Sequence, residues 1–163
     1  MVGYGPADPD RADPPRGAVA PIMLPSKDDL LVALYSAGPA CGLPLCVYGR
    51  DLLGLYRRRR ARPELAGVIA SARTEIIADI NRWVSRNVVA PESAPLHHIS
   101  LGTVIDRVAC AAELALHSLM TADPGSEVTH RAWTALAEVE LEYGDLVAAV
   151  TARQRRLPAG DPP

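Results

Sequence analysis

The feature that most constrains the fold of this chain is a helical spacing of apolar residues that recurs along the sequence. From Leu65 to Val84, apolar residues recur at every third or fourth position, and charged residues mostly occupy the other sides. The same spacing extends from Leu101 to Leu119 and from Trp133 to Val150. No segment shows the two-residue alternation of a strand, so helices must pack on helices. The sequence therefore predicts an all-α fold.

About five helices are expected in a single bundle. They are predicted to start at Ser26, near position 45, at Pro63, near Ser100 and near position 126, the last one ending near 155. The composition is 48% hydrophobic but contains no Phe, which favours a core of aliphatic residues with good helix propensity. The expected buried stripe of the fifth helix consists of Trp133, Leu136, Val139, Tyr143, Leu146 and Val150.

The two ends of the chain differ from this central region. Residues 1–25 contain six prolines and almost no apolar periodicity, so they are predicted to form a disordered N-terminal arm. The helical domain is expected over residues 26–155, and residues 156–163 are predicted to form a disordered tail.

Charge and cysteine content narrow the class of protein. A net charge of −2 makes nucleic acid an improbable partner, because phosphate binding needs a basic face. Three cysteines are too few, and the wrong number, for a disulfide framework. No stretch approaches the roughly 20 apolar residues of a membrane span. The start of the chain lacks the pattern of a signal peptide, so a cytoplasmic location is expected.

The segment LHHISLGTVIDRVACAAELALHSL, residues 96–119, resembles a bacterial family known as domain of unknown function 4254. The matching positions are Leu96, His97, Leu101, Gly102, Ile105, Asp106 and Arg107. The amphipathic segment RTEIIADINRWV, residues 73–84, resembles the preceding helix of that family. The chain departs from the family pattern at Ile99, where an acidic residue is expected. The resemblance implies an all-helical fold and brings no biochemical activity.

The main candidate site is a polar cluster made of His97, His98, Asp106 and Arg107. A carboxylate that orients an imidazole is a common arrangement for acid–base work or metal ligation. In that interpretation Arg107 holds an anionic group and Asp106 orients a histidine that moves a proton.

The structural interpretation of the same stretch is favoured. Asp106 is rotated by roughly 100° from Ile105, which faces the core, so Asp106 lies at the boundary of the apolar stripe. A carboxylate there is costly to leave unpaired, and we expect it to be held by an arginine or histidine from the third helix or the preceding loop. The small Gly102 is expected to permit close approach of another helix.

Metal sites are weaker candidates. Cys41 and Cys46 have a spacing seen in half of a zinc site, but both lie among apolar residues. Glu127 and His130 have the spacing of one di-metal motif, and Glu113 and His117 share a helix face. A second complete motif is missing, so no metal or cofactor is expected.

The run RRRRAR, residues 57–62, is a basic cluster at the predicted end of the second helix, where cations favour the helix dipole. Four successive arginines point in four directions around a helix and cannot form one dense stripe.

Two functions follow from these patterns. The leading hypothesis is a non-catalytic module that acts through protein contacts, as a homo-oligomer or with another protein. The alternative is a small-molecule enzyme or binder with a pocket around His97, Asp106 and Arg107.

Overall fold

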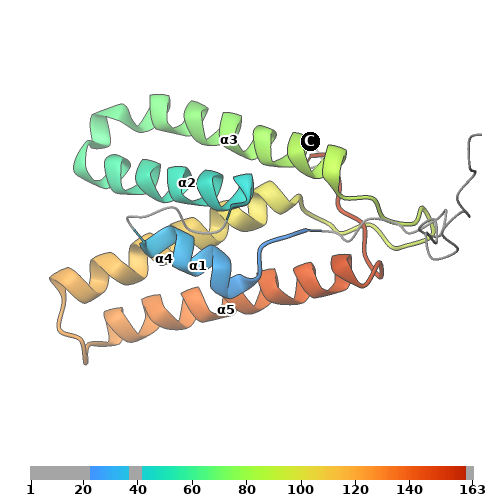
Figure 1. Cartoon of the computed structure of the whole chain (residues 1–163). Coiled ribbons are helices and arrows are strands. Elements are labelled where there is room, and N and C mark those ends of the chain that lie inside the picture. The colour runs from blue at the N-terminus through green and yellow to red at the C-terminus, as the bar shows by residue number, and fades with distance from the viewer. Residues whose placement is uncertain (1–22, 37–41, 161–163) are drawn as a thin grey trace, which may run out of the picture.

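The computed structural model describes residues 23–36 and 42–160, and it confirms the all-α fold (Figure 1). The helices are α1 (Lys27–Tyr35), α2 (Pro44–Ala61), α3 (Ala66–Asn87), α4 (Leu101–Thr121) and α5 (Glu127–Thr151), with a short 3₁₀ turn, Pro63–Leu65, between α2 and α3. The described residues contain no strand and a single isolated bridge, between Leu96 and Arg156.

The helices form two antiparallel pairs that pack on each other. The α2–α3 pair lies over the α4–α5 pair, and α4 packs against α2, α3 and α5 (Figure 1). The core is therefore built around α4, which supplies Leu101, Val104, Ile105, Val108, Ala109, Ala112 and Ala115. The core contains no Phe, and Tyr143 of α5 is its largest fully buried side chain.

Serine caps fix where three of the helices begin. The Oγ atoms of Ser26, Ser100 and Ser126 each accept a hydrogen bond from the backbone N–H three residues later. Such a bond satisfies one of the backbone donors that a helix leaves unpaired at its N-terminus. The predicted starts of the first, fourth and fifth helices are confirmed by these caps.

The contact between α3 and α4 depends on Gly102, as the sequence predicts. A Cβ atom at Gly102 would lie 2.7 Å from the backbone oxygen of Ile77 and 2.8 Å from Oδ1 of Asn81. That same Oδ1 atom accepts a hydrogen bond of 3.0 Å from the Gly102 N–H. Asn81 is buried, so this bond also satisfies a polar side chain inside the interface.

Helix α1 packs mainly against α2 and also contacts α5. At its start, Lys27 packs near Gly144, and the backbone oxygen of Pro25 accepts a hydrogen bond from the Tyr143 hydroxyl. At the end of α1, the Tyr35 hydroxyl donates a hydrogen bond to the backbone oxygen of Ala112 in α4. Because α1 has only nine residues, it covers a limited part of the hairpin (Figure 1).

The two halves of the hairpin are consequently buried to different degrees. We define the inner half as residues 101–112 and 136–151, and the outer half as residues 113–121 and 127–135. Eight of the eleven buried residues of α4 lie in the inner half. In α5, the outer half contains a single buried residue, Thr129.

Two sequence expectations are corrected by the helices. Trp133 is 40% exposed, so it does not belong to the buried stripe of α5. The reason is that the outer half of α5 lies beyond the start of α1, which packs near Gly144. Helix α5 also ends at Thr151 rather than near 155, because Arg153 adopts a positive φ of 59° just after it.

The predicted terminal segments are described in part. Residues 1–22 and 161–163 lie outside the described residues. Of the predicted N-terminal arm, Leu24 packs against the core. The predicted tail is corrected at its start: the Arg156 N–H donates to Pro95 O, Arg156 O accepts from the His97 N–H, and Leu157 packs against the core. These contacts tie the chain after α5 to the loop before α4.

Among the described helices, none is long and apolar enough to cross a membrane.

Candidate functional site

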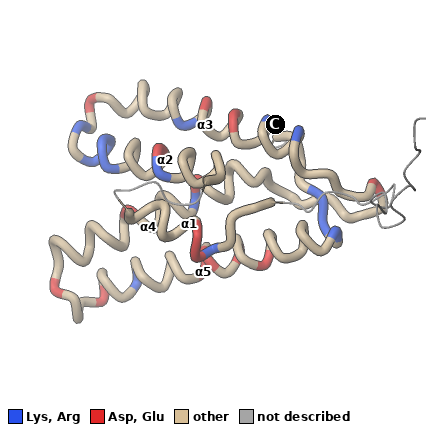
Figure 2. Tube along the Cα trace, viewed as in Figure 1, with Lys and Arg blue, Asp and Glu red and all other residues tan. Residues whose placement is uncertain are grey.

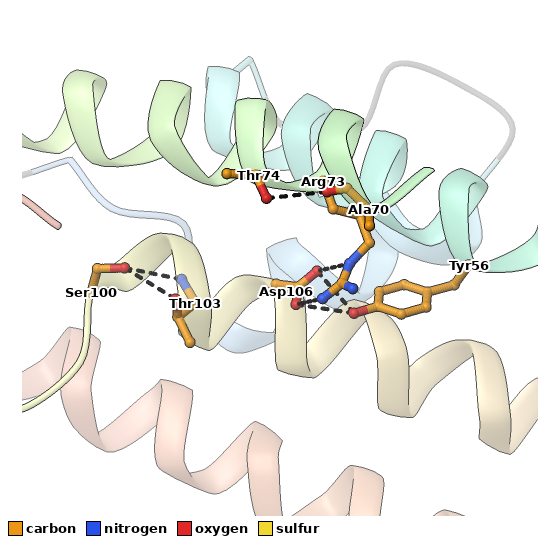
Figure 3. Close-up of polar contacts among 7 residues, drawn as sticks. All are labelled: Tyr56, Ala70, Arg73, Thr74, Ser100, Thr103 and Asp106. Atoms are coloured by element: carbon orange, nitrogen blue, oxygen red, sulfur yellow. Dashed lines mark hydrogen bonds and ion pairs between the residues drawn. The ribbon is translucent and has the colours of Figure 1, made fainter. Parts of the chain in front are cut away.

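Asp106 is the centre of a polar cluster between α2, α3 and α4 (Figure 3). Arg73 of α3 donates from Nε to Oδ1 at 3.1 Å and from Nη2 to Oδ2 at 2.5 Å. The hydroxyl of Tyr56 in α2 lies 3.0 Å from both carboxylate oxygens. The expectation that an arginine from the third helix holds Asp106 is confirmed.

The surroundings of Tyr56 keep its hydroxyl protonated. Burial raises the pKa of Tyr56 above its ordinary value, and the nearby charge of Asp106 raises it further. The Tyr56 hydroxyl therefore stays a hydrogen-bond donor. The guanidinium of Arg73 also lies over the Tyr56 ring, 4.7 Å from its centroid, which adds a cation–π attraction.

A second ion pair joins α2 to α4 farther along both helices. Arg60 donates from Nε to Oε1 of Glu113 at 3.0 Å and from Nη2 to Oε2 at 2.5 Å. The Glu113 side chain is buried, whereas Arg60 is partly exposed. Two bidentate arginine–carboxylate pairs therefore fasten α4 to its neighbours, which is the geometry that guanidinium favours.

Cys110 lies on α4 between the two carboxylates. Its thiol is the free one among the described cysteines and is half-buried. Burial raises the pKa of the Cys110 thiol above its ordinary value, so the neutral form predominates at neutral pH. The environment of Cys110 is therefore the opposite of that of a reactive thiolate.

The structure does not bring the four predicted cluster residues together. His97 lies in the loop before α4, where its Nδ1 is 2.9 Å from the backbone oxygen of Ile99 and its ring contacts the ring of His98, with 4.5 Å between centroids. The side chain of Arg107 points toward α5, where it forms an exposed ion pair with Glu142. Asp106 alone of the four is held at the α2–α3–α4 contact.

Asp106 does not form the predicted carboxylate–histidine pair with His97 or His98. Both oxygens of Asp106 are already occupied by Arg73 and Tyr56, and neither histidine is a partner of Asp106. A general base must reach the proton of a bound substrate, and this carboxylate faces neighbouring helices instead. Its bonds are those of a buried polar group satisfied by its surroundings.

Two adjoining cavities lie on α4, from the end of its inner half into its outer half. One, the arginine cavity, has a volume of about 270 Å³ and is lined by Tyr56, Arg59, Arg60, Cys110, Glu113 and Leu114. The other, the alanine groove, has a volume of about 530 Å³, and its apolar lining includes Ala111, Leu114, Val128, Ala132 and Ala135. Arg60 and Leu114 line both cavities, so the two cavities adjoin each other.

The arginines of the 57–62 run gather at one end of α2 (Figure 2). They face different surroundings: Arg58 lines a cavity shared with Asp51 and Glu75, whereas Arg59 and Arg60 line the arginine cavity. This divergence agrees with the expectation that the run does not form a single stripe.

The metal-site candidates are engaged in other contacts. Glu113 is paired with Arg60, and Glu127 is paired with Arg131. No three His, Cys, Asp or Glu side chains in the described part of the chain lie close enough to hold an ion together.

The two cysteines considered for a zinc site differ in what the structure describes. Cys41 lies outside the described residues, and Cys46 is fully buried in the core and disulfide-bonded, so its sulfur is no thiolate ligand. Disulfides are uncommon in a reducing cytoplasm. The cytoplasmic location expected from the sequence stays a prediction.

The sequence did not reveal Tyr56, Arg73 or the pairing of Arg60 with Glu113. One signal was present: Tyr56 and Arg60 are four residues apart on α2, and Asp106 and Glu113 are seven apart on α4. Each pair therefore lies on one helix face. Which two faces meet is a property of the tertiary packing.

Comparison with known proteins gives no relatives: no family model, no curated protein and no solved structure matches this chain. The resemblance to domain of unknown function 4254 is therefore still a prediction.

Proposed function

We propose that this protein is a non-catalytic helical module that acts through protein contacts and associates with a second copy of itself. The observation that carries the proposal is the exposed apolar surface on the outer half of the α4–α5 hairpin. Five large apolar side chains are exposed there, Leu114, Leu119, Met120, Val128 and Trp133. The inner half of the hairpin exposes a single one, Leu141. Clustered exposed apolar residues are typical of interaction sites, whereas scattered ones are ordinary.

We call Leu119, Met120 and Trp133 the α1-side patch: Leu119 and Trp133 continue helix faces that meet α1, and Met120 is the exposed residue directly after Leu119. Leu119 lies seven residues after Ala112, whose carbonyl accepts the Tyr35 hydroxyl of α1. Trp133 lies seven residues before Glu140, which has an electrostatic contact with Lys27 of α1. Seven residues are almost two full turns, so both residues continue the helix faces that meet α1 in the inner half.

The α1-side patch therefore has the chemistry of a helix-packing surface without its helix. Met120 is flexible and Trp133 is large and amphipathic, and residues of both kinds are enriched at protein interfaces. A second copy offers the same apolar surface, and a two-fold pairing would bury both at once.

Sedimentation velocity of the purified protein over a range of concentrations tests this proposal. The parent protein is expected to form dimers, and Met120→Glu is expected to shift it toward monomer. The matched control is Val68→Glu on α3, because Val68 is 71% exposed and Met120 is 75% exposed. Both changes add one charge at an exposed apolar position, so only the patch variant is expected to lose association. A parent protein that stays monomeric throughout would overturn the proposed self-association.

A further inference from the structure

We propose that the arginine cavity and the alanine groove together bind a small amphipathic anion, of the chemical class of a medium-chain alkyl carboxylate. None of the residues that line this site belongs to the α1-side patch. Leu114 precedes Leu119 by five residues, and Val128 precedes Trp133 by five, which is a rotation of about 140° in each helix. The inference is therefore independent of the proposed self-association.

The arginine cavity supplies the recognition of the negative charge. Arg59 has no hydrogen bond or ion pair to any described residue, and it lines this cavity. Arg60 uses Nε and Nη2 on Glu113, so its Nη1 group makes no bond within the described region. A guanidinium offers five donors in one plane, and two adjacent guanidinium groups suit a carboxylate.

The local charge also favours an anion over a cation. The two cavities are lined by three arginines, Arg59, Arg60 and Arg131, and by one carboxylate, Glu113. The Glu113 side chain is only 7% exposed, and both of its oxygens are covered by Arg60. The lining is thus basic although the whole chain has a net charge of −2.

The alanine groove supplies the space for an alkyl chain. Its volume of about 530 Å³ lies within the range of small-molecule sites, roughly 300–1,000 Å³. Four of its lining residues are alanines, which leave room that larger side chains would fill. Leu114, shared by both cavities, places the start of the apolar wall next to the arginines.

Isothermal titration calorimetry with decanoate, below its micelle-forming concentration, tests the site. Decanoate is expected to bind at least about tenfold more tightly than decan-1-ol or decyltrimethylammonium, since a hydrogen bond to a charged group has about that effect. Each methylene added from hexanoate to decanoate is expected to tighten binding by up to about fourfold, until the groove is full.

Matched variants separate the two parts of the site. Arg59→Gln is expected to weaken decanoate binding about tenfold, while Arg58→Gln, on the neighbouring residue that lines a different cavity, leaves it unchanged. Ala135→Trp fills the alanine groove and is expected to abolish binding. Ala137→Trp changes an exposed alanine two residues farther along α5 and is expected to have no effect.

Several results would overturn the inference. The parent protein could fail to bind decanoate, or could bind decanoate and decan-1-ol with equal affinity. The Arg59→Gln or Ala135→Trp protein could also bind decanoate as tightly as the parent does. A loss of self-association in Ala135→Trp, without decanoate binding to the parent, would show that a second copy occupies the groove instead.

Discussion

The inner and outer halves of the α4–α5 hairpin belong to the same two helices but differ in how completely neighbouring helices cover them. In the inner half, the side chains of α4 are covered by α1, α2 and α3, and even a carboxylate there has an arginine and a tyrosine as partners. In the outer half, large apolar side chains face solvent and two cavities adjoin. The difference teaches that the apolar spacing of a helix can extend beyond the part of that helix that neighbouring helices cover. The part of the hairpin that other helices do not cover carries the two proposed binding surfaces.

The largest expected contrast comes from the same substitution at two leucines of α4. Leu101 is completely buried, and Leu119 is 42% exposed. Leu101→Ala is expected to reduce the free energy of unfolding by about 2–5 kcal/mol, through lost burial and a cavity. Leu119→Ala is expected to change it by less than about 1 kcal/mol in the monomer. Urea unfolding at low protein concentration measures both, and similar losses would contradict the comparison.

Alanine substitutions at two glycines sharpen the comparison, because they are expected to change the free energy of unfolding in opposite directions. At Gly102 a Cβ meets the backbone of α3, so Gly102→Ala should destabilise the fold by about 1–3 kcal/mol. At Gly54 on α2, nothing lies within 4 Å of an added Cβ. Gly54→Ala should therefore stabilise the fold by about 0.4–1 kcal/mol, through helix propensity and a less flexible unfolded chain. Thermal unfolding of the two variants gives the signs directly, and a neutral Gly102→Ala would refute the close contact.

Adjacent charged residues on α4 test whether Asp106 is structural. Asp106→Ala is expected to lower the free energy of unfolding by about 1–3 kcal/mol, because it strands Arg73 and Tyr56 at a buried contact. Arg107→Ala removes an exposed pair with Glu142 and is expected to cost less than about 1 kcal/mol. Chemical unfolding compares the two variants. An Asp106→Ala protein as stable as the parent would remove the structural role assigned to this carboxylate.

The smallest expected effect is a pH dependence from Tyr56. Its folded pKa is raised above the ordinary 10.0, mainly by burial, so the folded chain keeps a proton that the unfolded chain loses. The stability that this group contributes is full below the unfolded pKa and is lost as pH rises above it. Between about pH 9 and pH 11, unfolding free energy should fall more steeply in the parent than in Tyr56→Phe. Parallel slopes in the two proteins would exclude this coupling.

The helices, their serine caps and the Gly102 contact could be predicted from the sequence, because each depends on local spacing and local chemistry. The exposure of Trp133 could not, since the pattern of α5 does not say where the covering helix lies. An arginine or histidine from the third helix or the preceding loop was predicted to hold Asp106, which agrees with Arg73 without singling it out, whereas Tyr56 of α2 was not predicted. The contacts of Arg156 and Leu157 were missed for the same reason: Arg156 bonds to a loop far away in the sequence, and Leu157 packs against the core.

Hydrogen–deuterium exchange of the two hairpin halves, followed by mass spectrometry at low and high protein concentration, tests the central claim most directly. The inner half is expected to be strongly protected at every concentration, because its residues are buried within the monomer. The outer half is expected to exchange faster in dilute protein and to gain protection as concentration rises, and Met120→Glu should remove that gain. Equal protection of both halves at all concentrations would contradict the account.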